Sequence, residues 1–449
     1  MRRRSTLAAG PFAAALFTMV PVLTTLVGSN PAAADNWPQW RGPNANSISS
    51  ETGIATEWSK TKNVAWRLPL PGPAGATPAI WNDRIFLTSS VGSDEGADLV
   101  LICANTKGEQ LWQVKVGSGN KNARSSEGNS ASASPSTDGK HVWVFFGTGV
   151  LACYDFDGNE VWKFNVQDRY GKFAIQFGMT STPVLDGDHL YLQLIHGEMR
   201  GDYTVAKVIK LDKKTGKEIW AVDRPSEAIV ENKHSYASPF IYDDGQQRFL
   251  VTHGADCTVA YDLEDGRELW RLSGLNGRSK FNQNQYDPTL RFVASPSFAD
   301  NVIIVPTAKK GPVVAIRPSE GMTGEISGAQ SAIQWVHEKT PDVCCPLILG
   351  DLVYFCRKDG KVFCLNLETG EELYYERTHN SQHRATPVYA DGHIYLCARD
   401  GHCTVLKTGP EFEIVAENDL GETITASPAI SDGTLYLRTY DALYAIREN

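Results

Sequence analysis

A short apolar run that begins just after Ser-Pro or Thr-Pro recurs along the chain. The pairs are Thr77-Pro78, Ser134-Pro135, Thr182-Pro183, Ser238-Pro239, Ser295-Pro296, Thr386-Pro387 and Ser427-Pro428, and Cys345-Pro346 holds the same place in one unit. A turn follows each run, often Asp-Gly, and then an alternating apolar and aromatic run such as "HLYLQL" or "HIYLC". Asp-Gly between alternating apolar runs is a strong hairpin signal. The pattern therefore predicts eight copies of a β-hairpin.

Each hairpin is followed by a further strand, a second turn and an aromatic residue. The second turns read "DFDGNE", "DKKTGKE", "LEDGRE" and "LETGEE". The strands after them carry Trp112, Trp162, Trp220, Trp270 and Trp335, with Tyr374 in the sixth unit and Val415 in the seventh. Four antiparallel strands that recur every 40 to 60 residues indicate a β-propeller. We expect the large rings to lie between neighbouring sheets, where they bury much apolar area.

The eighth unit ends after three strands, at Asn449. A lone strand-like stretch, "NVAWRLPL" at 63–70, precedes the first unit and carries Trp66. It can supply the missing fourth strand and close the ring, which removes an open sheet edge. We therefore predict an all-β, eight-bladed propeller closed by an N-terminal strand that completes the last blade. A seven-bladed ring remains open if the weak unit at 404–419 is irregular.

The first 34 residues have the pattern of a targeting segment. Arg2, Arg3 and Arg4 precede a mostly apolar stretch from Leu7 to Val27, and small residues end it before Asp35. This order predicts a cleaved signal peptide over 1–34 and a propeller domain over 35–449. We expect an exported protein, periplasmic or secreted, with no membrane span after cleavage. A retained N-terminal anchor is the alternative, and the choice between general and twin-arginine export stays open.

The net charge limits the kinds of partner that the protein can bind, and the cysteine pattern indicates the role of several cysteines. The formal net charge is −9, and it becomes more negative once the three N-terminal arginines are removed. Nucleic-acid binding needs clustered Lys and Arg, and the basic residues here are scattered, so no nucleic-acid partner is expected. Nine cysteines are an odd number for an exported chain. Cys103, Cys153 and Cys364 share a repeat position with Ala260, which indicates small buried packing residues.

The repeat resembles that of a known superfamily. "LDKKTGKEIW", "YDLEDGRELW" and "LNLETGEELY" are similar to the repeat of the pyrroloquinoline quinone (PQQ) dehydrogenases, in which a small residue, Asp, a Thr-Gly turn and Trp recur. The start "NWPQWRGPNANSIS" resembles exported PQQ-like repeat proteins of planctomycete-type bacteria. The resemblance implies either a quinone-dependent dehydrogenase or a non-enzymatic propeller such as the lipoprotein of the outer-membrane barrel-assembly machinery. Fold alone does not separate the two.

Residues for quinone chemistry are only partly present. In the dehydrogenases, adjacent cysteines form a strained disulfide beside the quinone, and Cys344-Cys345 could imitate it. However, Cys345 replaces the Ser or Thr of the sixth unit, so two small packing residues are the simpler interpretation. The enzymes also need Ca²⁺ held by Glu and Asn, and an Asp base, and none of these can be assigned to a matching motif. We therefore expect no metal and no cofactor, with PQQ and Ca²⁺ as the alternative.

The connections before each Ser-Pro should gather at one face, around a central funnel. Polar and aromatic groups that converge on a concavity form the default binding site. The candidate residues are Arg124, Glu127, Asn129, Arg169, Tyr170, His234, Tyr236, Asn282, Arg291, His383 and Arg384. The sequence thus favours a non-catalytic, monomeric scaffold that binds a small ligand or a protein partner at the funnel. A PQQ-dependent dehydrogenase of alcohols or sugars is the alternative function.

Overall fold

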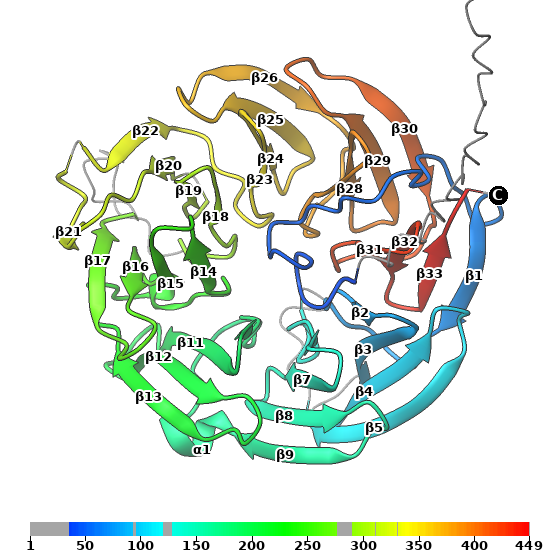
Figure 1. Cartoon of the computed structure of the whole chain (residues 1–449), viewed down its shortest axis with the longest axis horizontal. Coiled ribbons are helices and arrows are strands. Elements are labelled where there is room, and N and C mark those ends of the chain that lie inside the picture. Colours follow the sequence, from blue (N-terminus) through cyan, green and yellow to red (C-terminus); the bar gives the residue numbers. More distant parts are fainter. Residues whose placement is uncertain are drawn as a thin grey trace, which may run out of the picture. The chain divides into compact units, whose positions relative to one another are not determined.

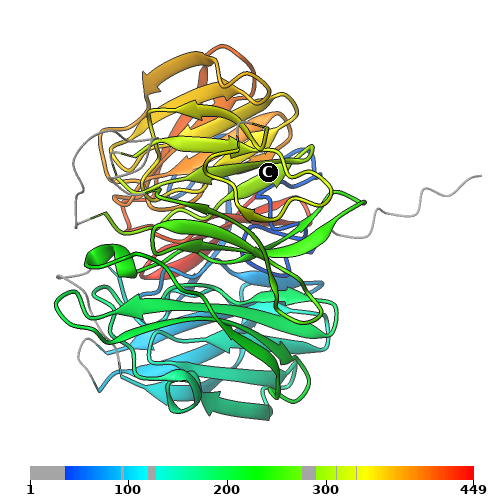
Figure 2. The ribbon, with the colours of Figure 1, turned by 90° about the vertical axis from the view of Figure 1, so that its left-hand side faces the viewer.

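The computed structural model describes residues 36–92, 96–119, 128–275, 290–309, 311–329 and 331–448. The predicted signal peptide lies outside the described residues. Eight antiparallel sheets surround a central axis, which confirms the predicted eight-bladed, all-β propeller (Figure 1). Figure 2 shows the ring from its side, with the strands running between its two faces.

The blades follow one another in chain order, each with its first strand innermost (Figure 1). Blades 1 to 3 are β2 (Ala79–Trp81), β3 (Arg84–Val91), β4 (Asp98–Asn105) and β5 (Gln110–Ser118); β6 (Ser136–Thr137), β7 (His141–Phe145), β8 (Val150–Asp155) and β9 (Glu160–Asn165); and β10 (Val184–Asp186), β11 (His189–Gly197), β12 (Thr204–Asp212) and β13 (Glu218–Asp223). Blades 4 and 5 are β14 (Phe240–Asp243), β15 (Arg248–Gly254), β16 (Cys257–Tyr261) and β17 (Glu268–Ser273); and β18 (Ser297–Ala299), β19 (Val302–Pro306), β20 (Val313–Ile316) and β22 (Ile333–His337).

Blades 6 to 8 complete the ring. They are β23 (Leu347–Leu349), β24 (Leu352–Cys356), β25 (Lys361–Asn366) and β26 (Glu372–Arg377); β27 (Val388–Ala390), β28 (His393–Cys397), β29 (His402–Lys407) and β30 (Ile414–Asp419); and β31 (Ala429–Ser431), β32 (Thr434–Arg438), β33 (Ala442–Ile446) and β1 (Val64–Pro69). β1 pairs antiparallel with β33, so a strand from the start of the chain lies in the last sheet. The buried Arg438 guanidinium also links blade 8 to blade 1, because it donates to the carbonyl oxygens of Ala74 and Thr88.

The burial pattern explains why these segments are strands. β3 is buried on both faces through its centre, because blades pack against it from both sides. β5, at the rim, alternates between exposed and partly buried side chains. The turn between β27 and β28 places Asp391 and Gly392 at φ 48° and 77°, which is the geometry of a type I′ hairpin turn. The Asp-Gly signal in the sequence thus corresponds to the turn that joins the first two strands of a blade.

The repeated tryptophans join each blade to the next. Trp112 donates its indole N–H to the Phe156 carbonyl at 2.9 Å, and Trp335 donates to the Leu367 carbonyl at 2.8 Å. Equivalent bonds run from Trp66 to Thr106, from Trp162 to Lys213 and from Trp220 to Leu263. Trp270 is fully buried. The five hydrogen-bonded rings lie between neighbouring sheets, over the glycine of the next blade's second turn.

A ring of hydrogen bonds, which we call the girdle, explains the Ser-Pro and Thr-Pro repeat. At each step the backbone N–H of one repeat residue donates to the side chain of the equivalent residue in the next blade. The donor and acceptor pairs are Thr77 and Ser134, Ser134 and Thr182, Thr182 and Ser238, Ser238 and Ser295, Ser295 and Cys345, Cys345 and Thr386, and Thr386 and Ser427. The Thr77 hydroxyl donates to the Ser427 carbonyl and completes the circle. The girdle therefore ties all eight blades together around the central axis.

Residues 36–48 cross the centre of the ring (Figure 1). Trp37 pairs with Ile80 of β2, and the Thr137 N–H donates to the Pro38 carbonyl at 2.8 Å. The buried Arg41 side chain donates to the Pro296 carbonyl and the Ser297 hydroxyl. These partners lie on the first strands of their blades or directly before them, so this segment packs against the inner strands. The sequence pattern did not predict this central segment.

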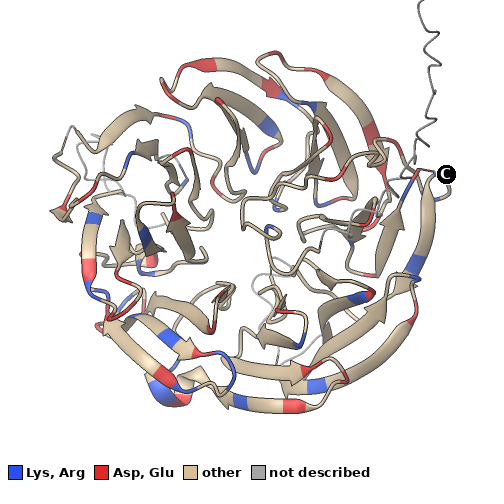
Figure 3. Cartoon of the chain, in the orientation of Figure 1, with Lys and Arg blue, Asp and Glu red and all other residues tan. Residues whose placement is uncertain are grey.

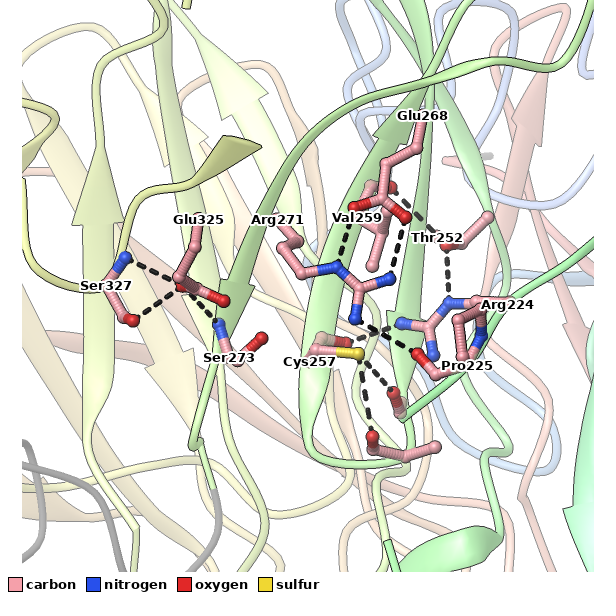
Figure 4. Close-up of polar contacts among 12 residues, drawn as sticks. Arg224, Pro225, Thr252, Cys257, Val259, Glu268, Arg271, Ser273, Glu325 and Ser327 are labelled. Carbon is pink, nitrogen blue, oxygen red and sulfur yellow. Dashed lines mark hydrogen bonds and ion pairs between the residues drawn. The ribbon is translucent and has the colours of Figure 1, made fainter. Parts of the chain in front are cut away.

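Blade 4 carries an extra strand and a polar cluster at its border (Figure 4). β21 (Gly324–Glu325) pairs parallel with β17, and the Glu325 carboxylate accepts from the Ser273 N–H at 3.2 Å. Arg271 makes two bonds to Glu268 and one to the Pro225 carbonyl. The buried Arg224 donates to the Thr252 hydroxyl and the Cys257 carbonyl. These bonds join blade 4 to the segment that leads into it and to the β20–β22 connection, so we assign the cluster a structural role.

Candidate functional site

Strand order decides which loops share a face. The four strands of a blade alternate in direction, so the turn between its second and third strands lies on the same face as the loop that enters the next blade. We call this the funnel face, and the loops between blades the inter-blade loops. The Asp-Gly and Thr-Gly turns lie on the opposite face. Polar residues on the inter-blade loops are thus brought together from blades that are far apart in sequence.

A cavity of about 180 Å³ opens at the centre of the funnel face. We call it the funnel, and every blade contributes to its lining. The inter-blade loops supply Gly75, Gly128, Asn129, Ser132, Phe177, Thr180, Tyr236, Arg291, Val293, Val343, Arg384 and Thr425, and second-to-third strand turns supply Lys358 and Tyr440.

Three basic side chains stand among the described residues that line the funnel: Arg291, Lys358 and Arg384. The Arg291 guanidinium lies over the Phe177 ring, 4.6 Å from its centroid, and its Nη1 is 3.5 Å from a Glu231 carboxylate oxygen. Arg384 donates to the Gln382 side chain at 3.3 Å. No carboxylate stands among the described lining residues. The described lining thus carries positive and no negative side chains, although Glu231 lies beside Arg291. This differs from the acidic chain as a whole and from the mixed charges around the ring (Figure 3).

Aromatic and amide groups are fixed beside these cations. The Tyr236 hydroxyl accepts from the Phe177 N–H at 3.1 Å, and the two rings are 5.9 Å apart. Burial raises the pKa of Tyr236, so the hydroxyl stays neutral at working pH. The Asn129 side-chain oxygen accepts from the Ala131 N–H at 2.9 Å. Hydrogen bonds within the wall thus orient several polar groups before any ligand arrives.

The structure brings together some of the predicted site residues. Asn129, Tyr236, Arg291 and Arg384 all line the funnel. Arg124, Glu127 and Asn282 lie outside the described residues.

Two predicted histidines are buried near the loops instead of lining the funnel. His234 Nε2 lies 2.8 Å from the Gly197 carbonyl oxygen, and His383 Nδ1 lies 3.2 Å from the Ser381 carbonyl oxygen. Burial lowers the pKa of His383 to about 4. Both side chains support loop conformation.

Arg169 and Tyr170 require a correction, because they do not line the funnel. They end the short helix α1 (Val166–Tyr170), whose first turn is capped by the Asn165 side chain. Arg169 lies over the Phe164 ring and donates to the Gly216 carbonyl at 2.9 Å. Tyr170 donates to the Glu218 carboxylate at 2.8 Å. Both therefore fasten blade 2 to the second turn of blade 3.

The sequence analysis did not name the other described lining residues, among which Phe177, Lys358 and Tyr440 carry the largest side chains. Phe177 lies in an inter-blade loop that was already considered, but aromatic residues are so common in this chain that it did not stand out. Lys358 and Tyr440 lie in second-to-third strand turns. The alternation of strand direction could have placed those turns on the funnel face. Lys358 also lines a neighbouring cavity of about 410 Å³ with Lys309, Arg357 and Gln382.

Cys344 and Cys345 are both buried thiols in the structure, with no disulfide between them. The Cys345 sulfur takes the place of a hydroxyl in the girdle and accepts from the Ser295 N–H at 3.2 Å. This contact supports the packing interpretation of Cys345. Within the described residues, no three His, Cys, Asp or Glu side chains are placed to hold a metal ion.

Comparisons with known proteins agree with this architecture. The family model described as "Outer membrane protein assembly factor BamB" matches residues 46–191 and 97–409. A search of curated proteins found no match to this sequence.

Three solved structures illustrate the fold. BamB from Moraxella catarrhalis is 16% identical with a TM-score of 0.58, and the match covers 85% of this chain and 99% of that one. The computationally designed Ika8 protein is 13% identical with a TM-score of 0.57, covering 86% and 99%. The quinohemoprotein alcohol dehydrogenase from Comamonas testosteroni is 13% identical with a TM-score of 0.64, covering 92% and 80%. Such identities show the fold alone. Together with the match of the family model over most of the chain, they lead to one conclusion: this protein belongs to the BamB family of PQQ-like β-propellers.

Proposed function

We propose that this protein is an exported, non-catalytic binding protein whose funnel takes an anionic ligand. The observation that carries the proposal is the convergence of Arg291, Lys358 and Arg384 on one cavity with no carboxylate in its described lining. A partly enclosed site has a lower effective dielectric than water, so charge pairs are stronger there than on the open surface. Guanidinium groups also bind carboxylates and phosphates through paired hydrogen bonds.

The size of the funnel limits the ligand. A cavity of about 180 Å³ is smaller than the roughly 300–1,000 Å³ of typical drug-sized sites. It suits a small polycarboxylate, or an acidic side chain on a loop of a protein partner. The Phe177 and Tyr236 rings offer an apolar surface beside the cations. We therefore expect the best small ligands to join several negative charges to a compact or flat body.

The described funnel residues do not fit PQQ with Ca²⁺ chemistry. Three cations could pair with the carboxylates of the quinone. However, Ca²⁺ prefers carboxylate and carbonyl oxygens, and the described lining supplies the Asn129 amide and the hydroxyls of Ser132, Thr180 and Thr425 without a carboxylate. For the same reason, the described lining residues offer no base for an alcohol proton. We accordingly propose that the funnel neither binds PQQ tightly nor oxidises alcohols or sugars.

The remaining expectations stay part of the proposal. The basic, then apolar, then small-residue order of residues 1–34 supports export. In the described part of the chain, no helix has the length and apolarity needed to cross a membrane. Net negative charge argues against a nucleic-acid partner. We further propose that the protein is a monomer.

Titration calorimetry with a graded set of anions tests the function. The probes are benzoate, isophthalate and benzene-1,3,5-tricarboxylate, which carry increasing charge on one ring, together with inorganic phosphate and PQQ with and without Ca²⁺. We expect affinity to rise with the number of carboxylates and to fall in Arg384→Gln. Arg317→Gln is the matched control, because Arg317 pairs with Glu368 and does not line the funnel. Equal affinity for all probes, or sub-micromolar PQQ binding with dye-linked alcohol oxidation, would overturn the proposal.

A further inference from the structure

Six of the nine cysteines lie in blades 6 and 7 or directly before them, and four of these, Cys344, Cys356, Cys397 and Cys403, can be grouped into two pairs. Cys344 follows the funnel residue Val343, and Cys356 precedes the turn that carries Lys358. Cys397 and Cys403 flank the turn between β28 and β29. All four side chains are buried. Their pairing is a separate matter from the adjacent pair Cys344-Cys345 considered above.

Cys397 and Cys403 face each other across an antiparallel hairpin. They are direct partners in the register of β28 and β29. The next pair towards the turn is hydrogen-bonded, since the Ala398 N–H donates to the His402 carbonyl at 2.7 Å. Hydrogen-bonded and non-hydrogen-bonded pairs alternate, so Cys397 and Cys403 form a non-hydrogen-bonded pair, with Cα atoms about 4.5 Å apart. That spacing lies within the range that a disulfide requires.

The second pair lies at one end of blade 6. Leu347 of β23 is the register partner of Tyr354 of β24, which brings the residues just before Leu347 to the end of β24 that carries Cys356. Cys344 and Cys356 also belong to one buried cluster. Cys345 is engaged elsewhere, because its sulfur accepts from the girdle N–H of Ser295. Cys344 is therefore placed to bond with Cys356 and not with its neighbour in sequence.

We propose that Cys344 pairs with Cys356, and Cys397 with Cys403, as two disulfides when the chain folds in an oxidising compartment. In each pair two S–H bonds break, one S–S bond forms, and two protons and two electrons leave. The electrons pass by thiol–disulfide exchange to a disulfide oxidant, such as oxidised glutathione or a disulfide-bearing carrier protein, which becomes a dithiol. Disulfides persist in the compartments to which exported proteins are sent.

Burial determines when these bonds can form. The thiolate is the species that attacks a disulfide. The neighbouring Cys356 thiol, together with burial, raises the pKa of Cys344, and burial raises the pKa of Cys403. The folded protein should therefore exchange slowly, and oxidation should take place during folding. Once formed, the Cys344–Cys356 bond would tie the loop of Val343 to the turn of Lys358, and both of these residues line the funnel.

Thiol counting after oxidative refolding tests the proposal. The reduced, denatured full chain is refolded in a mixture of reduced and oxidised glutathione. It is then denatured without reductant and alkylated with N-ethylmaleimide. We expect five alkylated cysteines by intact mass, and nine after reduction. Cleavage before Asp351 separates Cys344 from Cys356, and cleavage before Asp400 separates Cys397 from Cys403. Peptide mapping should therefore show each pair as two linked peptides.

Two variants test whether the protected cysteines are those of the two proposed pairs. Cys403→Ser should leave Cys397 reactive and give six alkylated cysteines. Cys364→Ala is the matched control, since its buried thiol lies near the Leu365 carbonyl; it should give four and leave both linked peptides in place. Nine alkylated cysteines in the wild-type chain, or a bond between Cys344 and Cys345 within one peptide, would overturn the proposal.

Discussion

Gly370→Ala tests whether the tryptophan of one blade is wedged over the turn of the next. Gly370 has φ 72°, and a Cβ added there would lie 2.6 Å from the Trp335 ring atom Cδ2. Carbon atoms prefer separations of about 3.5–4.0 Å. The indole cannot easily retreat, because its N–H is bonded to the Leu367 carbonyl at 2.8 Å and the ring is buried. The substitution therefore forces two packed blades apart.

The expected cost has two parts. A non-glycine residue in the left-handed region costs about 1–2 kcal/mol, and overpacking a filled site costs about 1–3 kcal/mol more. Gly370→Ala should thus lower the free energy of unfolding by about 2–5 kcal/mol. Gly392→Ala is the matched control, because Gly392 has φ 77° but open space around its Cβ position. It should cost only the backbone part, about 1–2 kcal/mol.

Urea denaturation followed by circular dichroism measures the difference in the free energy of unfolding between Gly370→Ala and Gly392→Ala. The double variant Trp335→Ala with Gly370→Ala adds a direct test, since removing the indole removes the steric conflict. Its loss of stability should be smaller than the sum of the two single losses by about 1–3 kcal/mol. Equal losses for Gly370→Ala and Gly392→Ala, together with additive behaviour of the double variant, would refute the wedge.

Three further predictions concern other parts of the ring. Cys345→Ser should change the free energy of unfolding by less than about 1 kcal/mol in urea denaturation, whereas Cys345→Ala strands the buried Ser295 N–H and should cost about 1–3 kcal/mol; equal effects would contradict the girdle. Burial lowers the pKa of His383 and His196 to about 4, below the unfolded value of 6.5. Between these two pH values the unfolded state binds more protons than the folded state. The free energy of unfolding should therefore fall as the pH falls from 7 to 5. We expect about 1–2 kcal/mol for each histidine, and His383→Gln should reduce the slope of melting temperature against pH; an unchanged slope would show that His383 is accessible to protons in the fold. Deleting residues 36–48 should lower the melting temperature and raise binding of a hydrophobic dye, and a deletion protein that melts like the full chain would show that this segment does not support the ring.

The repeat made the fold predictable, because each signal is local. Asp391-Gly392 specifies a turn by backbone conformation alone, and the Trp of "KEIW" indicates the fourth strand of a blade. The Ser-Pro pairs marked where each blade starts. Their physical role could not be predicted, because the Ser134 hydroxyl accepts a hydrogen bond from the Thr77 N–H in the preceding blade. The sequence pattern of one repeat does not indicate a contact between two repeats.

The funnel was predictable only in part, for a similar reason. Chain order placed Arg291 and Arg384 on inter-blade loops, and the structure puts both at the cavity. Arg169 occupies an equivalent place in the sequence, yet α1 directs it towards blade 3. Side-chain direction at the end of a short helix depends on tertiary contacts that a repeat pattern does not encode. Lys358 was missed because it lies on a turn and not on a loop between blades.

Native mass spectrometry of the protein isolated from its own source tests the anionic funnel most directly. We expect an acidic small molecule or peptide to be bound to the wild-type protein, lost in Arg384→Gln and kept in Arg317→Gln. Raising the salt concentration should release it, because the binding rests on charge. A bound species that Arg384→Gln retains, or one whose mass is that of PQQ with Ca²⁺, would contradict the account.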